Sequence, residues 1–505
     1  MLTEKEEKLK QLQEVKTALS TMMEKRIPRI LWENYQARIN EIKNEMANLN
    51  KLDDNEKNIH VIWIGVLPKY EFNNLKLWAK YNPDYKIHIW TDSSHILTNQ
   101  LDNIIFANSW NEDATEYDYQ REAMLRDDFY NNWHLTNPEK TFDENAKEFL
   151  LDGSKDETII LEWLKEGQES FIQEQTEIES YTPSQVILHD VNQEKDNIFP
   201  NEKYYQGYLK TLEHLHICAG AADRLRYAVL NKFGGVYLDT DVAVKFNLQD
   251  LKDNQEMMNL INLVELNRRE NLATNVLLNQ MILFNNLKQL NDDHFEDFAK
   301  KWEIHFGGDY EKNLPVFKEI FNKFKDMSLN LTPNMEISDF PIDNAFQIIF
   351  SVNGVDDIED DLHDHFDVNN CFIISKKDSK FLQDIMKKIE VTDEKIKNLD
   401  TYKKMVNKNE MIIHQTGPTN IIFSFKEKDQ NYFDNYANHT DEIFSEEVIN
   451  GCSSTWYDNQ VSKDIITDDK ELKSLFFSDA TEVQNYLEQN EKQLNELEKE
   501  NSLEF

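Results

Sequence analysis

The sequence predicts an α/β protein with large helical insertions and with helical appendages at its N- and C-terminal ends. Two observations predict the α/β class. A strand–helix–strand unit is recognisable between residues 58 and 91, and a helix followed by two glycines and a short buried strand is recognisable between residues 222 and 241. A third observation, apolar stripes of helical period near both ends of the chain, predicts the appendages.

Length and composition narrow the classes of protein to consider. The chain has 505 residues and a formal net charge of −39. That length suffices for a large catalytic domain with accessory segments. The excess of acidic residues argues against nucleic acid as a partner, because its phosphates would be repelled. The three cysteines are widely spaced, so neither a disulfide framework nor a cysteine metal site is predicted, and the chain suits a reducing compartment.

The first residues contain no apolar run of the kind found in Sec signal peptides. No run elsewhere approaches the ~18 apolar residues that span a bilayer. We therefore expect that an exported form uses a route without a cleaved N-terminal signal.

Residues 1–50 predict two helices, because two apolar stripes of helical period are separated by Pro28. We expect a helical hairpin over residues 1–55. An apolar stripe is first of all a core-facing feature, so packing against the body of the protein is the favoured role. A docking module is the alternative.

The first strand–helix–strand unit begins with the apolar, β-branched run Asn58–Gly65. A helix then ends at the turn formed by Asn82 and Pro83, and a second strand is predicted over Lys86–Thr91. Such a unit is typical of a nucleotide-binding half-domain. Trp63 lies near the end of the first strand, where a flat aromatic ring is suited to stacking on a base.

Two long segments, 95–215 and 250–335, predict helical insertions without a recognisable motif. His214 and His216 have a spacing that could ligate a metal, but spacing alone rarely means that, and we interpret them as helix surface. The chain ends in an apolar stripe preceded by an approximate capping box, which predicts a helical tail over residues 466–505.

The most informative stretch is Phe233-Gly-Gly-Val-Tyr-Leu-Asp-Thr-Asp241. It begins on the last turn of a predicted helix that carries apolar residues every three or four positions. Gly234 and Gly235 end that helix, since a glycine adopts the left-handed cap that other residues resist. The next three residues are β-formers and predict a short buried strand.

Asp239 and Asp241 follow this strand directly, where it would run out into a cleft. Two carboxylates one residue apart in an extended chain point to the same side and repel each other. A hard divalent cation with oxygen ligands would relieve that repulsion and leave room for substrate phosphates. The pattern therefore predicts a metal–phosphate site.

The run Ala221-Ala222-Asp223-Arg224-Leu225-Arg226, followed by Gly-Gly-Val-Tyr-Leu-Asp-Thr-Asp, resembles the nucleotide-sugar core of Asp-x-Asp glycosyltransferases. It is most similar to the glucosyltransferase domain of the large clostridial toxins and of related bacterial effector glucosyltransferases. The resemblance implies a GT-A-type nucleotide-sugar-binding core over residues 56–465, a UDP-sugar donor, Mn²⁺ or Mg²⁺, and transfer that retains the anomeric configuration.

The resemblance also implies roles for five residues of this core. Asp241 is expected to bind the metal directly, and Asp239 to hold the ribose and a metal-bound water. Asp223 and Arg226 are expected to orient the hydroxyl groups of the sugar. Tyr237 is expected to support the site beside the ribose.

Four further positions follow from the resemblance. Trp63 is expected to stack on the uracil base, and Asn370, at the start of a buried strand, to reach the sugar and the phosphate. Near the C-terminus, Ser454 is expected to help hold the metal. Trp456, on a loop that closes over the donor, is expected to touch the β-phosphate and the glycosidic oxygen. A turn at Gly417–Pro418 is expected near the donor site.

Two positions depart from the clostridial pattern: Ala222 stands where a serine is usual, and Gly451 where a glutamate is usual. The resemblance implies a monomeric bacterial toxin or effector that transfers a hexose, UDP-glucose being the expected donor, to a host protein such as a small GTPase or a translation factor. It would then act in the host cytosol, with membrane association through the N-terminal helices. An enzyme of polysaccharide or glycolipid synthesis in the bacterial cytoplasm, and an inactive nucleotide-sugar-binding module, are the alternatives.

Overall fold

The computed structural model describes most of the chain between residues 52 and 244 and a second part that includes residues 367–397. The described residues are 10–11, 52–68, 71–109, 119–153, 156–182, 185–244, 295, 315, 318, 321–322, 332–333, 337, 348–353, 367–397, 416–417 and 448–450. The predicted N-terminal hairpin, the 250–335 insertion and the C-terminal tail therefore lie largely or wholly outside the described residues. None of the described helices is both long enough and apolar enough to cross a membrane.

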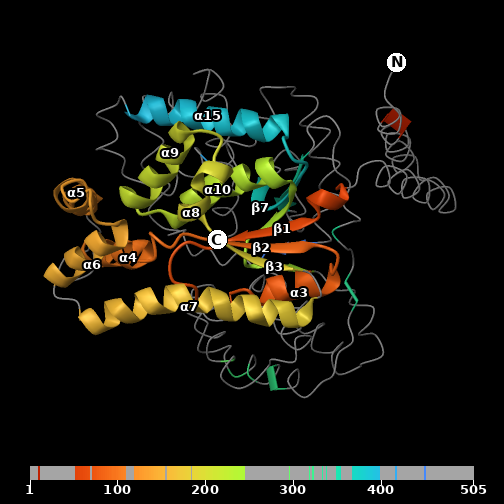
Figure 1. Cartoon of the computed structure of the whole chain (residues 1–505), viewed down its shortest axis with the longest axis horizontal. Helices are drawn as coiled ribbons and strands as arrows, with labels where there is room; N and C mark the ends of the chain where they lie inside the picture. The colour runs from red at the N-terminus through yellow and green to blue at the C-terminus, as the bar shows by residue number, and fades with distance from the viewer. Residues whose placement is uncertain are drawn as a thin grey trace, which may run out of the picture.

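A mixed β-sheet forms the centre of the described part of the chain (Figure 1). Its strand order is β3-β2-β1-β4-β7-β6. The first four of these run parallel to one another, whereas β7 is antiparallel to both β4 and β6. The strands are β1 (Asn58–Ile62), β2 (Lys86–Thr91), β3 (Val186–Asp190), β4 (Gly235–Leu238), β6 (Ile348–Asn353) and β7 (Asp367–Ser375).

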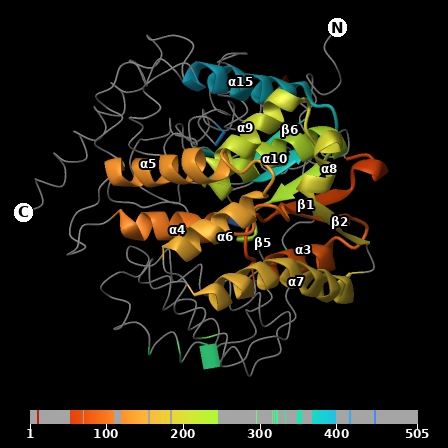
Figure 2. The ribbon, with the colours of Figure 1, turned by 60° about the vertical axis from the view of Figure 1, so that its left-hand side comes forward.

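Helices cover both faces of this sheet, as Figures 1 and 2 show from two directions. One face carries α8 (Val191–Ile198), α9 (Glu202–Glu213), α10 (Cys218–Phe233) and α15 (Lys380–Lys397), and the other carries α3 (Asn73–Tyr81) and α7 (Glu157–Tyr181). This arrangement of layers is the one expected for a largely parallel sheet, whose strands are buried on both faces.

The remaining described elements lie beside this layered body. Four helical segments share a separate apolar cluster built around Phe129 and Phe142. These segments are α4 (Thr98–Asn108), α5 (Tyr119–Asp128), the π-helical turn Phe129–His134 and α6 (Phe142–Asp152). A short 3₁₀ turn, Asp54–Glu56, precedes β1, and a two-stranded antiparallel sheet pairs β5 (Val242–Val244) with β8 (Val448–Asn450).

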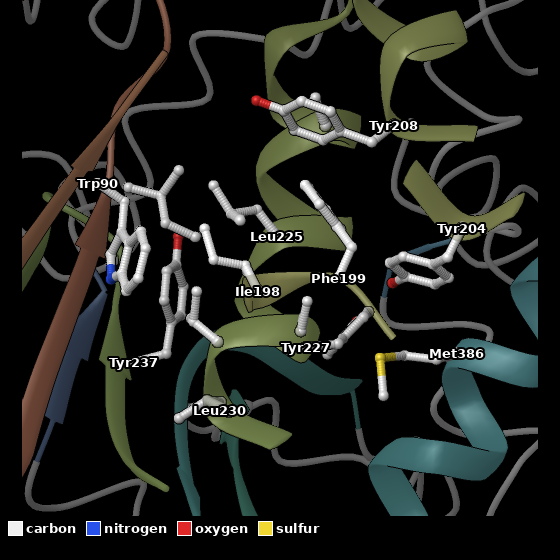
Figure 3. Packing of buried hydrophobic residues seen from close by; sticks show 14 of the residues in the cluster. Trp90, Ile198, Phe199, Tyr204, Tyr208, Leu225, Tyr227, Leu230, Tyr237 and Met386 are labelled. Carbon is white, nitrogen blue, oxygen red and sulfur yellow. The ribbon is translucent and has the colours of Figure 1, made fainter. Parts of the chain in front are cut away.

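A large apolar core lies between the sheet and the helices α8, α9, α10 and α15. Figure 3 shows Trp90 and Tyr237 projecting from the strands toward Leu225, Tyr227 and other side chains of the helices. Helix α10 contributes much of its length to this core, because its residues 220–221 and 223–230 are buried. The helix that carries Asp223 and Arg226 is therefore held rigidly against the sheet.

The structure confirms the predicted strand–helix–strand unit, with β2 at the predicted residues, and the helix–Gly-Gly–strand element. Two expectations need correction. The first strand ends at Ile62 rather than Gly65, and the 95–215 segment is not wholly helical, because Val186–Asp190 forms β3 at the edge of the sheet. Only the first of the five β3 residues is fully buried, so this strand lacks the continuous apolar run of a central parallel strand.

The two glycines between α10 and β4 are required by geometry. Gly234 has φ 67° and Gly235 has φ 110°, a region that residues with a Cβ rarely adopt. A Cβ on Gly235 would lie 2.4 Å from the carbonyl oxygen of Asn58, and one on Gly234 would lie 2.8 Å from the amide nitrogen of Lys377. The tight turn sets the register with which β4 enters the sheet beside β1.

We predict that Gly235→Ala lowers the free energy of unfolding by at least about 2 kcal/mol, because it adds backbone strain and a clash with neighbouring backbone. Gly153→Ala is the matched control, since Gly153 has φ −75° and its added Cβ would make only ordinary contacts at 3.6 Å or more. Urea denaturation of both variants measures the difference. Equal stability of the two variants would contradict this account of the turn.

Candidate active site

The predicted site residues that the structure describes gather at the edge of the sheet where the four parallel strands end. Trp63 directly follows β1, and Asp239 directly follows β4. Because β7 is antiparallel to β4, with Leu238 opposite Phe372, the first residues of β7 also lie at this edge and bring Asn370 to it. In sheets of this kind, ligands bind outside the carboxyl ends of the strands.

Arg226 is the centre of the site. Its side chain is 5% exposed, and its guanidinium lies 2.9 Å from the Asp223 carboxylate and 3.3 Å from the Asp239 carboxylate. It also donates a hydrogen bond of 2.5 Å to the backbone carbonyl of Asn370 and packs over the Tyr237 ring at 4.3 Å. One cation therefore connects helix α10, the end of β4 and the start of β7.

Asp223 lies one helical turn before Arg226 and is buried. The Asn370 side-chain amide donates to its Oδ1 at 2.9 Å, and the Thr416 hydroxyl donates to its Oδ2 at 2.9 Å. Burial raises the pKa of the Asp223 carboxyl, while Arg226, Thr416 and Asn370 oppose that shift. Such hydrogen bonding stabilises the charged form of a buried carboxylate and fixes its orientation.

Asp239 differs from Asp223 because its side chain remains 33% exposed and so faces the open side of the site. The Tyr237 hydroxyl donates a 2.5 Å hydrogen bond to its Oδ1. Desolvation raises the pKa of Asp239 to about 7; Arg226 opposes this shift and repulsion from Asp241 adds to it. The Asp239 carboxylate is thus the member of the network that a further cation would stabilise most.

The sequence predicts an extended chain between Asp239 and Asp241, but the structure has a turn there. The Val242 amide donates to the Asp239 carbonyl at 3.1 Å, so residues 239–242 form a turn that leads into β5. The turn is required because β5 leaves the main sheet and pairs with β8 instead. The Asp241 carboxylate still lies close enough to Asp239 to raise the pKa of Asp239.

The donor set of this turn fits a hard divalent cation. Two partly exposed carboxylates, Asp239 and Asp241, lie within electrostatic reach of each other, and oxygen ligands suit Mn²⁺ or Mg²⁺. Within the described residues no cluster of three or more His, Cys, Asp or Glu side chains could enclose a metal ion. A cation here would therefore complete its coordination with substrate oxygens, water or residues outside the described part, such as Ser454.

Trp63 lies immediately beyond β1 and is only partly buried. Its amide donates to the Trp90 carbonyl at 2.9 Å, and its indole nitrogen donates to the Val66 carbonyl at 3.1 Å. These bonds fix the ring at the sheet edge without enclosing it in the core. The ring therefore remains available for stacking, which a fully buried tryptophan would not be.

The structure adds two residues that sequence reasoning missed, Thr416 and Tyr227. The Tyr227 hydroxyl donates to the Thr416 carbonyl at 2.6 Å, which holds the Thr416 side chain against Asp223. Tyr227 lies one turn after Asp223, and the neighbouring Gly417–Pro418 turn was expected near the donor site. These two signals could have suggested the pair.

The remaining positions singled out from the sequence are two histidines and two residues near the C-terminus. His214 ends helix α9, whereas His216 is buried with φ 55°, so the interpretation of both as helix surface is wrong for His216. Phe129 and Phe142 pack edge-on against the His216 ring, which explains its burial. Ser454 and Trp456 lie outside the described residues.

Comparison with known proteins decides the family. The model of the TcdA/TcdB catalytic glycosyltransferase domain matches residues 57–415, which is more than half of the chain. The chain belongs to this family. It is a glycosyltransferase of the clostridial toxin type, with the α/β architecture of these domains.

Similar proteins include two curated toxins and one solved structure. Toxin B of Clostridioides difficile is 26% identical over 237 residues, which cover 41% of this chain and 9% of the toxin. Toxin A of Clostridium novyi is 24% identical over 390 residues, covering 72% of this chain and 16% of the toxin. The catalytic domain of alpha-toxin from Clostridium novyi matches with a TM-score of 0.50 and 18% identity, covering 88% and 87% of the two chains. The glycosyltransferase thus corresponds to a small part of the curated toxins.

We predict that Thr416→Val lowers the free energy of unfolding by about 1.5–3 kcal/mol, because the buried Asp223 carboxylate loses a hydrogen-bond donor. Thr416→Ser should retain most of the stability. Thr392→Val is the control, since its buried hydroxyl donates to a neutral carbonyl, that of Lys388, and its loss should cost about 1 kcal/mol. Urea unfolding of the three variants measures this, and equal losses at Thr416 and Thr392 would contradict it.

Proposed function

We propose that this glycosyltransferase transfers a hexose, glucose, from UDP-glucose to a host protein and retains the anomeric configuration. The observation that carries this proposal is the network in which Arg226 connects Asp223, Asp239 and the start of β7 at the carboxyl edge of the sheet. A nucleotide-sugar donor needs hydrogen-bonding groups for its hydroxyls beside groups that tolerate a diphosphate, and this network supplies both.

The donor would lie across the ends of β1 and β4. Trp63 would stack on the uracil, with Tyr237 and Asp239 beside the ribose. Asp223 and Arg226 would orient the sugar hydroxyls, and Asn370 would support the sugar and the phosphate. What supports this assignment is that Asn370 and Arg226 are already bound to each other and to Asp223. Side chains fixed in this way lose little conformational freedom when a ligand binds.

Asp239 and Asp241, with Ser454, would hold Mn²⁺ or Mg²⁺ at the exposed side of the network. When bound there, the cation would neutralise the charge that develops on the departing UDP diphosphate. Arg226 would keep Asp239 ionised and correctly oriented, and Tyr237 would fix its inner oxygen. Trp456 would cover the diphosphate from the C-terminal loop.

The acceptor is proposed to be a host protein, such as a small GTPase or a translation factor, modified in the host cytosol. Support comes from the kind of relative that matches: the curated proteins are named toxins and a cytotoxin. A direct experiment incubates the purified chain, Mn²⁺ and radiolabelled UDP-glucose with a lysate of eukaryotic cells. Label in a discrete protein band supports the proposal, and peptide mapping then gives the modified residue.

Other distributions of the label would contradict the proposed acceptor. Label confined to polysaccharide or lipid would indicate an enzyme of glycan synthesis. If UDP-glucose stays intact with and without lysate, the chain does not use this donor, and UDP-galactose or UDP-N-acetylglucosamine tested in parallel would show whether the sugar or the whole activity was misassigned.

We predict that Asp241→Asn lowers the rate of glucose release from UDP-glucose by at least ~100-fold, the range seen when one preorganised charge-stabilising group is lost. The fold should survive, because Asp241 repels Asp239 when no cation is bound. Asp152→Asn, at the exposed end of α6, makes the same charge change away from the site and should keep wild-type turnover. Normal, Mn²⁺-dependent turnover in Asp241→Asn would refute the metal role.

A further inference from the structure

Helix α3 touches the Asp239–Val242 turn from the face of the sheet opposite to α10. The side-chain amide of Asn74 donates to the Thr240 carbonyl at 2.9 Å. One helical turn later, the indole nitrogen of Trp78 donates to the Val242 carbonyl at 2.9 Å. Both residues are buried: Asn74 is 7% exposed and Trp78 is 1% exposed. The two carbonyls flank Asp241 on either side in the sequence.

We propose that Asn74 and Trp78 are positioning residues that hold the backbone on both sides of Asp241 and thereby aim its carboxylate at the cation. The inference rests on the proposed function, in which Asp241 binds Mn²⁺ or Mg²⁺. It assigns no catalytic contact to α3, because neither side chain touches a carboxylate of the turn in the hydrogen bonds described above.

Several backbone groups of the turn are held by hydrogen bonds. The Asp239 amide donates to the Cys371 carbonyl at 2.7 Å, and the Asp239 carbonyl accepts from the Val242 amide at 3.1 Å. Asn74 and Trp78 hold the carbonyls of Thr240 and Val242. The Thr240 hydroxyl adds a longer bond of 3.4 Å to Glu71, just before the helix. These bonds restrict the backbone on both sides of Asp241 and thereby the direction in which its side chain leaves the chain.

Helix α3 is itself firmly held, so it can impose a position on the turn. Lys76 on α3 is buried and pairs with Glu174 at 2.9 Å and with Glu177 at 2.5 Å, both on α7. The Trp78 ring also packs against Phe372 of β7, with ring centroids 5.8 Å apart. These contacts join α3 to its neighbours α7 and β7.

A positioning role explains why a helix needs hydrogen-bond donors at these two sites. Apolar residues would pack α3 against β5 equally well, yet they would leave the Thr240 and Val242 carbonyls without these donors. Metal ligands must be placed to within a few tenths of an ångström, and residues that orient ligands typically change metal affinity when altered.

The test compares three conservative variants of the full chain. Trp78→Phe keeps the aromatic ring and removes the indole donor, and Asn74→Leu keeps the shape and removes the amide donor. Trp90→Phe is the matched control, since it removes a buried indole bond, to His60 at 3.2 Å, that does not involve the turn. Mn²⁺ binding is followed by the loss of the free-ion electron paramagnetic resonance signal, and thermal melting is recorded for each protein.

We expect Trp78→Phe and Asn74→Leu each to weaken Mn²⁺ binding by about threefold to tenfold, the range that corresponds to one lost hydrogen bond. Trp90→Phe should bind Mn²⁺ like the wild type, although its melting temperature falls to a similar extent. The Mn²⁺ concentration that gives half-maximal UDP-glucose hydrolysis should rise by the same factor in Trp78→Phe and Asn74→Leu.

Two results would overturn the inference while leaving the proposed function intact. Unchanged Mn²⁺ affinity in Trp78→Phe and Asn74→Leu would show that α3 does not aim Asp241. Equal weakening in Trp90→Phe would show a general effect of lost stability. By contrast, absence of Mn²⁺ binding in the wild type would overturn the proposed metal role together with this inference.

Discussion

The site depends on one interaction, the burial of the Arg226 guanidinium between two carboxylates. A buried cation without partners would cost several kcal/mol, so the fold must bring anions and carbonyls to it. Asp223 comes from the same helix, Asp239 from the end of β4, and the Asn370 carbonyl from β7. Satisfying Arg226 therefore requires that α10, β4 and β7 meet in one relative position, which is where we propose that the donor binds.

Elements on both faces of the sheet position this corner of the structure, where α10, β4 and β7 meet. Gly234 and Gly235 allow α10 to turn sharply into β4, so that Asp223 and Asp239 can share one cation. Across the sheet, α3 holds the backbone of the turn that follows. Asp239 is the least enclosed member of the network, and its raised pKa reflects the combination of burial and the neighbouring Asp241. The cost of concentrating acidic groups there is consistent with a site that works with a bound cation.

Much of this corner could be predicted from sequence because its signals are local. The stripe of α10, the glycine pair and the short strand occupy one continuous stretch. Asn370 was expected from the resemblance to the clostridial toxin domains and not from a local pattern. Thr416 was missed because it is 193 residues from Asp223 in the sequence, and no local pattern predicts such a contact. Strand β3 was missed because an edge strand with partly exposed residues lacks the apolar run of a central one. The turn at Asp239 could not be predicted, because it depends on the pairing of β5 with β8, which is a tertiary contact.

The most direct test of the central claim is UDP-glucose turnover in Arg226→Lys, compared with Arg224→Lys. Both variants replace a buried arginine on α10. Both keep the positive charge but lose the planar guanidinium, which can donate two parallel hydrogen bonds. Arg224 pairs with Asp393 on α15, at 2.9 and 2.7 Å, rather than with Asp223 and Asp239. If the Arg226 network is the donor site, Arg226→Lys should lose at least ~100-fold in turnover, while Arg224→Lys loses stability with little change in turnover per folded molecule. Equal turnover in the two folded variants would contradict the account.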